Sequence, residues 1–145
     1  MKKIYLILLS LALVACSGKP SDRQIEQLVS QLVLSDGGAE TYELSDFEKT
    51  NGLAKNEQLY IADIRYKLTF KKGFEELSDQ VINDPSDSPF ETVGAGFKLM
   101  TMRMQFGDFK AGNSVVKEDR VQLVKTEQGW RLDNYQPAGA VHITP

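Results

Sequence analysis

Cysteine and histidine are scarce in this 145-residue chain, which contains one of each. A single cysteine cannot form a disulfide within the chain, so a small domain held together by several disulfides is excluded. A zinc site of the usual Cys/His kind needs more such ligands than the sequence contains. The 17 Lys and Arg are outnumbered by 20 Asp and Glu, which gives a net charge of −3. This balance argues against a nucleic-acid partner, which would need a basic surface.

Motifs for catalysis and for cofactor binding are missing as well. The single histidine, His142, is accompanied by no G-x-S-x-G nucleophile motif. The Gly-Ala-Gly segment at 94–96 lacks the lysine and the third glycine of a phosphate-binding loop. The acidic residues within 84–91 lack the spacing of a calcium-binding loop. The sequence therefore predicts no catalytic residue, no cofactor and no resident metal.

The N-terminal residues have the pattern of a targeting signal. Two lysines precede an apolar run over residues 4–14, which is too short to cross a bilayer as a helix. The run ends in Leu13-Val14-Ala15-Cys16. Charge, apolar core, small residues and cysteine in this order closely resemble the signal of bacterial lipoproteins. The resemblance implies removal of residues 1–15 by cleavage between Ala15 and Cys16, and a diacylglyceryl group on the Cys16 sulfur.

Lipidation would decide both the location and the chemistry of the chain. Several acyl chains on Cys16 hold a protein firmly on a membrane, and the modified sulfur is no longer a nucleophilic thiol. The resemblance also implies outer-membrane delivery facing the periplasm, because Ser17 stands where retained inner-membrane lipoproteins carry aspartate. Residues 16–20 form a lipidated N-terminus and a short tether. An ordinary secretory signal or a short membrane anchor is the alternative interpretation.

Residues 21–136 are expected to form one domain. Ser21 and Gln24 have the spacing of a helix-capping box, and apolar residues with helical spacing follow them. Because the opposite helix face is not basic, we expect this helix to pack on a core and not on a membrane. Strict alternation over residues 60–70 predicts a strand with one buried face. The apolar stripe of the helix consists of Ile25, Leu28, Val29, Leu32 and Val33.

The remaining segments complete an α+β fold. We expect one N-terminal amphipathic helix packed on a curved antiparallel sheet of four to five strands. The expected segments are a strand at 41–50, a turn at Asn51-Gly52, a short helix within 71–83, a polar loop at 84–89, a strand at 97–106, a hairpin of 115–126 and 130–135 turning at 127–129, and an irregular tail at 137–145.

The last hairpin carries a second resemblance. The segment from Val121 to Leu132 contains a charged turn, then Gly129-Trp130, then alternating residues. It is similar to the closing hairpin of small bacterial domains in the nuclear-transport-factor-2-like and cystatin-like group. The resemblance implies a helix packed on a curved sheet. Members related to the transport factor usually begin with two or three helices around a conical pocket, and this chain begins with one.

Three sets of residues could take part in binding. Met100, Met102 and Met104 would share one face of the expected strand, where thioether sulfur suits Cu(I); filling of an uneven core is the favoured interpretation. Trp130 is expected to anchor the hairpin on the sheet, with an exposed binding anchor as the alternative. Phe90 lies between Pro89 and Glu91 next to the polar loop, so we expect it to be an exposed contact residue.

The favoured functional hypothesis is a lipid-anchored periplasmic module that binds an envelope protein near the membrane and performs no chemistry. One form of it is an inhibitor or immunity-type lipoprotein. The first alternative is a small-ligand carrier or enzyme with a pocket between helix and sheet, which requires polar groups converging on an enclosed cavity. The second is a copper-handling protein that uses the three methionines.

Overall fold

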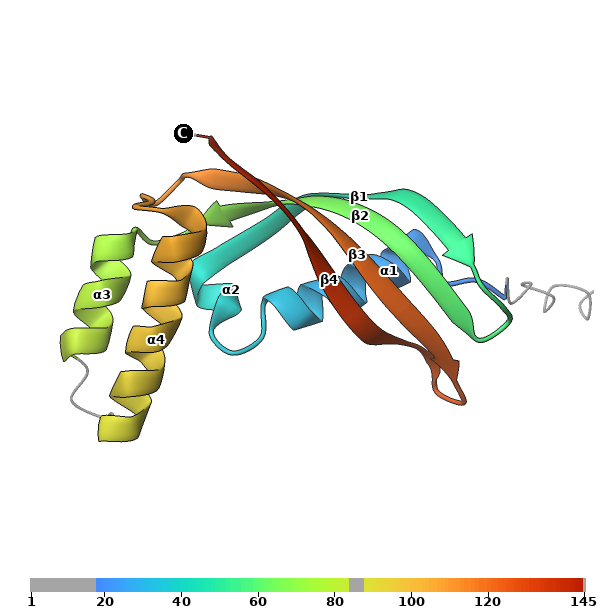
Figure 1. The fold of residues 1–145 in the computed structure, drawn as a ribbon, viewed down its shortest axis with the longest axis horizontal. Helices are drawn as coiled ribbons and strands as arrows, with labels where there is room; N and C mark the ends of the chain where they lie inside the picture. The colour runs from blue at the N-terminus through green and yellow to red at the C-terminus, as the bar shows by residue number, and fades with distance from the viewer. Residues whose placement is uncertain (1–17, 84–87, 145) are drawn as a thin grey trace, which may run out of the picture.

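A computed structural model describes residues 18–83 and 88–144 of the chain (Figure 1), without the side chains of residues 89, 90 and 139–144. The predicted cleavage and lipidation sites, Ala15 and Cys16, lie outside the described residues. The elements in chain order are α1 (Asp22–Val33), α2 (Gly38–Thr41), β1 (Tyr42–Ala54), β2 (Leu59–Phe70), α3 (Phe74–Asn83), α4 (Pro89–Phe106), β3 (Ser114–Thr126) and β4 (Gly129–Thr144).

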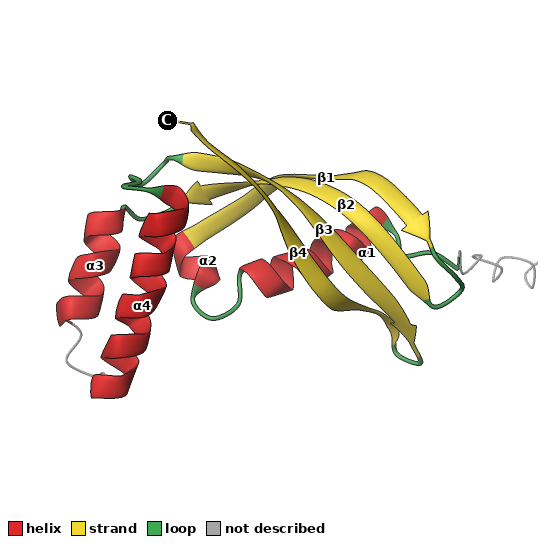
Figure 2. Ribbon diagram, in the orientation of Figure 1, coloured by secondary structure: helices red, strands yellow, loops and turns green. Residues whose placement is uncertain are grey.

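Four strands form one antiparallel sheet in the order β1-β2-β3-β4. Each strand pairs with the next along the chain, so the sheet is a meander. The sheet is curved, with α1 lying against one face and the α3–α4 pair standing beyond one end (Figure 2). This arrangement confirms the predicted α+β class, in which an N-terminal helix packs on an antiparallel sheet.

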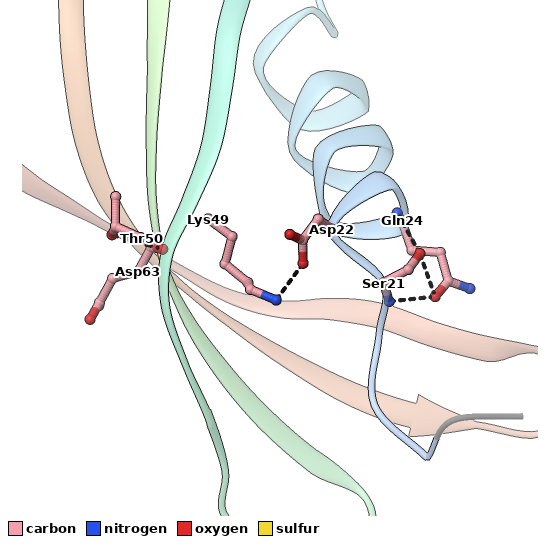
Figure 3. A network of polar contacts seen from close by, with 6 residues as sticks. All are labelled: Ser21, Asp22, Gln24, Lys49, Thr50 and Asp63. Carbon is pink, nitrogen blue, oxygen red and sulfur yellow. Dashed lines mark hydrogen bonds and ion pairs between the residues drawn. The ribbon is translucent and has the colours of Figure 1, made fainter.

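The first helix begins as the sequence predicts. The Ser21 hydroxyl accepts a hydrogen bond from the Gln24 backbone N–H at 3.2 Å, and the Gln24 side chain accepts one from the Ser21 backbone N–H at 2.9 Å (Figure 3). This reciprocal capping box satisfies two N–H groups that a helix start leaves unpaired. Ile25 and Val29 are fully buried, whereas Leu32 is 42% exposed. The helix is therefore a core element, as expected.

An ion pair ties the start of α1 to the sheet. Asp22, in the first turn, accepts a hydrogen bond from the Lys49 ammonium of β1 (Figure 3). The same hydrogen bond raises the pKa of Lys49. Pro20, two residues earlier, is already buried. Pro20, the last residue of the segment predicted as a tether, is therefore packed against the domain.

The core lies between α1 and the concave face of the sheet. The alternation predicted for β2 is confirmed, because every second side chain of this strand is buried. Val115, Val121 and Leu123 of β3 are fully buried on the same face. The buried side chains of β2 are Tyr60, Ala62, Ile64, Tyr66, Leu68 and Phe70.

A cluster of aromatic rings joins the α3–α4 pair to the end of the sheet. Phe70, the last residue of β2, stacks on Phe109 with ring centroids 3.9 Å apart and meets Phe106 of α4 edge to face at 5.4 Å. Phe109 also meets Phe74, the first residue of α3, at 6.0 Å. The chain leaves the sheet and returns to it at this cluster, since the Phe70 N–H donates to the Asn113 carbonyl at 2.8 Å. The helical pair is therefore an excursion between two paired strands.

The prediction of a strand at 97–106 is wrong, because this segment is part of helix α4. Ser88 and Glu91 form a second capping box, and Pro89 occupies the first helical turn, where a proline is tolerated. The methionines at every second position suggested a strand, but residues 97, 100 and 104 also recur with helical spacing. Phe90 is consequently in the first turn of a helix and not beside a loop that ends at residue 89.

Two further expectations are corrected at the strand ends. Asn51 and Gly52 lie inside β1, and the chain turns after Ala54 instead. The tail expected to be irregular at 137–145 is the second half of β4, which runs to Thr144 and pairs Ile143 with Val115. Pro137 suggested an interruption, but β4 is an edge strand, where a proline is accommodated. The helix within 71–83 and the hairpin turning before Gly129, whose φ is 106°, are confirmed.

Candidate interaction surface on α4

Four large apolar side chains form an exposed stripe along α4. Val93 and Phe97 are each 72% exposed, Met100 is 61% exposed and Met104 is 79% exposed. Their separations of four, three and four residues place them on one helix face. We call these four residues the α4 stripe. Large apolar residues scattered singly over a surface are ordinary, but a continuous row of them indicates a surface that another molecule covers.

The opposite face of the same helix is also apolar. Met102 and Phe106 are 7% and 6% exposed, and they belong to the hydrophobic core. Helix α4 is therefore apolar on both sides, a pattern found in helices that are buried all round. In this structure only one side is covered, and the α4 stripe is the side that remains open.

The charged side chains of α4 are held away from the stripe. The Lys98 ammonium donates to the carbonyl of Asp36 at 2.6 Å, beside α2. The Arg103 guanidinium forms an ion pair with Asp108 at 2.9 Å and lies over the Phe74 ring of α3 at 5.1 Å. These contacts direct both cations toward other parts of this chain. The α4 stripe itself contains no charged residue.

Two glycines, Gly94 and Gly96, lie on either side of the stripe. A Cβ atom built on either glycine would have no atom within 4 Å among those it could contact in this chain. Glycine inside a helix lowers stability by about 0.5–1 kcal/mol relative to alanine, and no packing within the described chain explains that loss here. The two glycines thus leave open space on both sides of the stripe.

The arrangement that the copper alternative requires, with three thioethers on one face, does not form. In a helix, Met102 lies on the face opposite Met100 and Met104, so the three thioethers do not share a face. Among residues 18–83 and 88–144, no group of three or more His, Cys, Asp or Glu is placed to hold a metal ion. The favoured interpretation, core filling, is right for Met102 and wrong for Met100 and Met104, which are exposed on the α4 stripe.

The two predicted contact residues have different positions. Trp130 is half-buried and meets Tyr60 edge to face, with ring centroids 6.3 Å apart. It packs against the core from β4, as its favoured interpretation expects. Phe90 is three residues before Val93 and continues the spacing of the α4 stripe in the sequence. Its side chain lies outside the described part of the structure.

A buried polar cluster lies on the concave face, where sequence reasoning expected no functional group. Asp119 is 3% exposed and accepts hydrogen bonds from the hydroxyl of Tyr66 at 2.7 Å, from the hydroxyl of Tyr135, and from the backbone N–H of Ala138 at 3.2 Å. The Lys117 ammonium is 3.8 Å from the same carboxylate. Burial raises the pKa of Tyr66 and of Tyr135 far above the ordinary value, so both hydroxyls stay protonated.

This cluster organises the sheet. It lies where β4 carries extra residues relative to β3, because Glu118 pairs with Ala138 while Val116 pairs with His142. Asp119 holds the backbone at the start of that irregularity. Each oxygen of its carboxylate has a hydrogen-bond partner, so the group is occupied in holding the fold. The sequence carried a signal for it, since Lys117 and Asp119 share the strand face of Val115 and Val121.

Apolar side chains pack between α1 and the sheet, where the carrier hypothesis places its pocket. A hollow of about 540 Å³ lies instead on the outer face of the sheet, where Asp63, Arg120 and Glu118 line it. Asp63 and Arg120 pair with each other at 2.6 Å, and this hydrogen bond lowers the pKa of Asp63. The charges in this hollow are therefore paired within the chain, which does not favour the carrier hypothesis.

Comparisons with protein-family models, with curated proteins and with solved structures give no match to this chain. The two resemblances seen in the sequence stay predictions. Within residues 18–83 and 88–144, no helix combines the length and the apolar character needed to cross a bilayer.

Proposed function

We propose that this chain is a lipid-anchored protein of the bacterial envelope that acts by binding another protein through the α4 stripe, without chemistry of its own. The single observation that carries the proposal is the stripe itself: four large apolar side chains, 61–79% exposed, on one face of a helix. The partner is a protein that lays a helix with an apolar face along α4. A helix is the occupant because the separations of four, three and four residues are those of helix pairing.

The position of α4 supports a protein partner over a lipid surface. The described chain begins at one end of the long axis, and the α3–α4 pair makes the other end (Figure 1). A strand of 13 residues, the length of β1 and β3, extends about 43 Å. An anchor on Cys16 with a short tether would hold the β1–β2 and β3–β4 turns near the membrane. The α3–α4 pair would then lie away from the membrane surface.

The charges around α4 also disfavour lipid as its occupant. Membrane-surface helices carry lysine and arginine beside their apolar face, where these contact anionic headgroups. The two cations of α4, Lys98 and Arg103, instead contact Asp36 and Asp108 of this chain. The neighbouring helix α3 has Glu75 and Glu76 in its first turn.

The proposal is tested by a photo-crosslinking amino acid placed at Met100 of the full-length chain in intact cells, with the same residue at Glu127 as the matched control. Glu127 is exposed in the β3–β4 turn, at the other end of the molecule. We expect one discrete protein adduct from position 100 and none from position 127. We also expect Phe97→Glu to abolish it, because a carboxylate would be buried at the contact. The Cys16→Ala variant should leave the membrane fraction.

Three outcomes would contradict the proposal. An adduct that survives Phe97→Glu would not depend on the stripe. The absence of any protein adduct at position 100 would leave the stripe without a protein partner. A Cys16→Ala chain that stays with the membrane would remove the lipid anchor from the account.

A further inference from the structure

We propose that the partner of the α4 stripe is a second copy of this chain, and that α4 pairs with α4 of the second copy in antiparallel orientation about a twofold axis near residues 98 and 99. This inference rests on the proposed function and identifies the protein that covers the stripe.

The width of the stripe selects one helix as its occupant. Residues 93, 97, 100 and 104 occupy alternate d and a positions of a heptad, and the sequence continues this spacing back to residue 90. A stripe restricted to a and d positions is the narrow seam of two-helix packing, whereas a helix covered by a broad core shows a wider apolar face. The 18 residues of α4 extend about 27 Å, which is enough for four turns of such a seam.

The stripe is complementary to itself when two copies run in opposite directions. With the axis between residues 98 and 99, Phe97 meets Met100 of the second copy, and Val93 meets Met104 of the second copy. Each pair then combines a rigid side chain with a flexible thioether, which adapts its shape to the neighbour and contacts an aromatic ring favourably. Because the stripe has no charged residue, the twofold axis brings no like charges together.

The two glycines fit the same arrangement. In an antiparallel pair, a residue beside the seam of one helix faces a residue on the corresponding side of the seam of the second helix. Because the helices run in opposite directions, a residue near the start of one helix faces a residue near the end of the other. Gly96 then lies beside Arg103 of the second copy, and Gly94 beside Thr101 of the second copy. The Thr101 side chain would fill the open space beside Gly94, and the aliphatic stem of Arg103 would fill that beside Gly96 while its guanidinium stays with Asp108 and Phe74. In a parallel pair each glycine would face a glycine, and that space would stay empty.

The orientation also agrees with anchoring to one membrane. Helix α4 runs across the long axis of the molecule, which separates it from the chain start (Figure 1). The twofold axis of an antiparallel helix pair is perpendicular to both helices, so the two chain starts can lie on the same side. The twofold axis of a parallel pair runs along the helices and would turn the two chain starts in opposite directions.

The test uses disulfide trapping in the full-length, membrane-anchored protein. Val93→Cys and Met104→Cys are co-expressed on copies with different tags, and mild oxidation is applied to the membranes. In the antiparallel pair these two positions are level, whereas two copies of position 93 are about 17 Å apart along the helices, well beyond disulfide reach. We expect the mixed disulfide, no disulfide between two Val93→Cys chains, and about tenfold less product when Phe97→Glu is added. Glu127→Cys is the matched exposed control and should give none.

The outcomes separate this inference from the function on which it rests. A disulfide between two Val93→Cys chains would show a parallel pair and overturn the inference. No disulfide, together with a photo-adduct at position 100 whose mass is not that of two copies, would also overturn it while the proposed function stands. No disulfide and no photo-adduct would overturn both.

Discussion

Asp119 carries a carboxylate in the interior, where an isolated charge would be strongly unfavourable. The two tyrosine hydroxyls, the backbone N–H of Ala138 and the Lys117 ammonium compensate for the lost water. Such a group contributes little net stability when it is complete, but removing one partner leaves the others buried without compensation. The cluster therefore governs how precisely β4 is placed beside β3.

We expect Asp119→Ala to lower the free energy of unfolding by about 3 kcal/mol, because it leaves two hydroxyls, an N–H group and an ammonium without their acceptor. Urea unfolding followed by the fluorescence of Trp130, the only tryptophan, measures the loss. The matched control is Glu118→Ala, which removes the neighbouring exposed carboxylate and should change stability by less than about 0.5 kcal/mol. Similar losses in the two variants would refute the structural role given to Asp119.

Sequence reasoning did not find this cluster, and the reason is physical. Lys117 and Asp119 alternate with outward residues exactly as buried residues do, but charged residues are rarely buried unless paired. Their partners Tyr66 and Tyr135 lie on the neighbouring strands, so only the sheet register brings the four groups together. The capping box at Ser21 was predictable because all of its atoms lie within four residues of sequence.

At the scale of elements, α4 is where prediction and structure differ most. The alternation of the three methionines is compatible with a strand and also with part of a helix. Gly94 and Gly96 favour the strand, because glycine has a low helix propensity. Two features favour the helix over the strand: the capping box at Ser88, and the packing of Phe106 on Phe70, which is far from it in the sequence. The α4 stripe could not be predicted while its helix was taken for a strand.

Replacing the glycines of α4 by alanine should stabilise the isolated chain and weaken its pairing with a second copy. The double variant with Gly94→Ala and Gly96→Ala should raise the free energy of unfolding of the isolated chain by about 1–2 kcal/mol, since both added Cβ atoms enter open space in a helix. The same variant should give less of the Val93–Met104 mixed disulfide in membranes, because the second copy is kept at a greater distance. A matched Gly112→Ala control, at a φ of 88° outside α4, should destabilise the chain without affecting pairing in the folded protein. Unchanged pairing in the double variant would contradict the role given to the glycines.

At the scale of the whole molecule, the sheet lies between the end where the described chain begins and the end formed by α3 and α4. The broad plan was predictable from sequence, since the helix on an antiparallel sheet follows from the stripe of α1 and the alternation of β2. The extension of β4 to Thr144 was not predictable from the sequence. Pro137 and the extra residues near it interrupt the alternation of side chains, although the pairing of β4 with β3 continues. The excursion of α3 and α4 from the sheet end, fixed by the Phe70 cluster, was not predictable either.

Both proposals require that the α4 stripe is covered when the protein is in its membrane. Methionine oxidation measures this directly, because the rate of sulfoxide formation follows the exposure of each thioether. Met102, at 7% exposure, is the internal reference for a covered thioether in the same helix. Membranes carrying the native chain and membranes carrying the Phe97→Glu variant are treated with dilute peroxide, and the three sites are compared by mass spectrometry. The account predicts that Met100 and Met104 of the native chain are oxidised almost as slowly as Met102, and that both become fast in the variant. Fast oxidation of Met100 and Met104 in the native chain, equal to that in the variant, would contradict it.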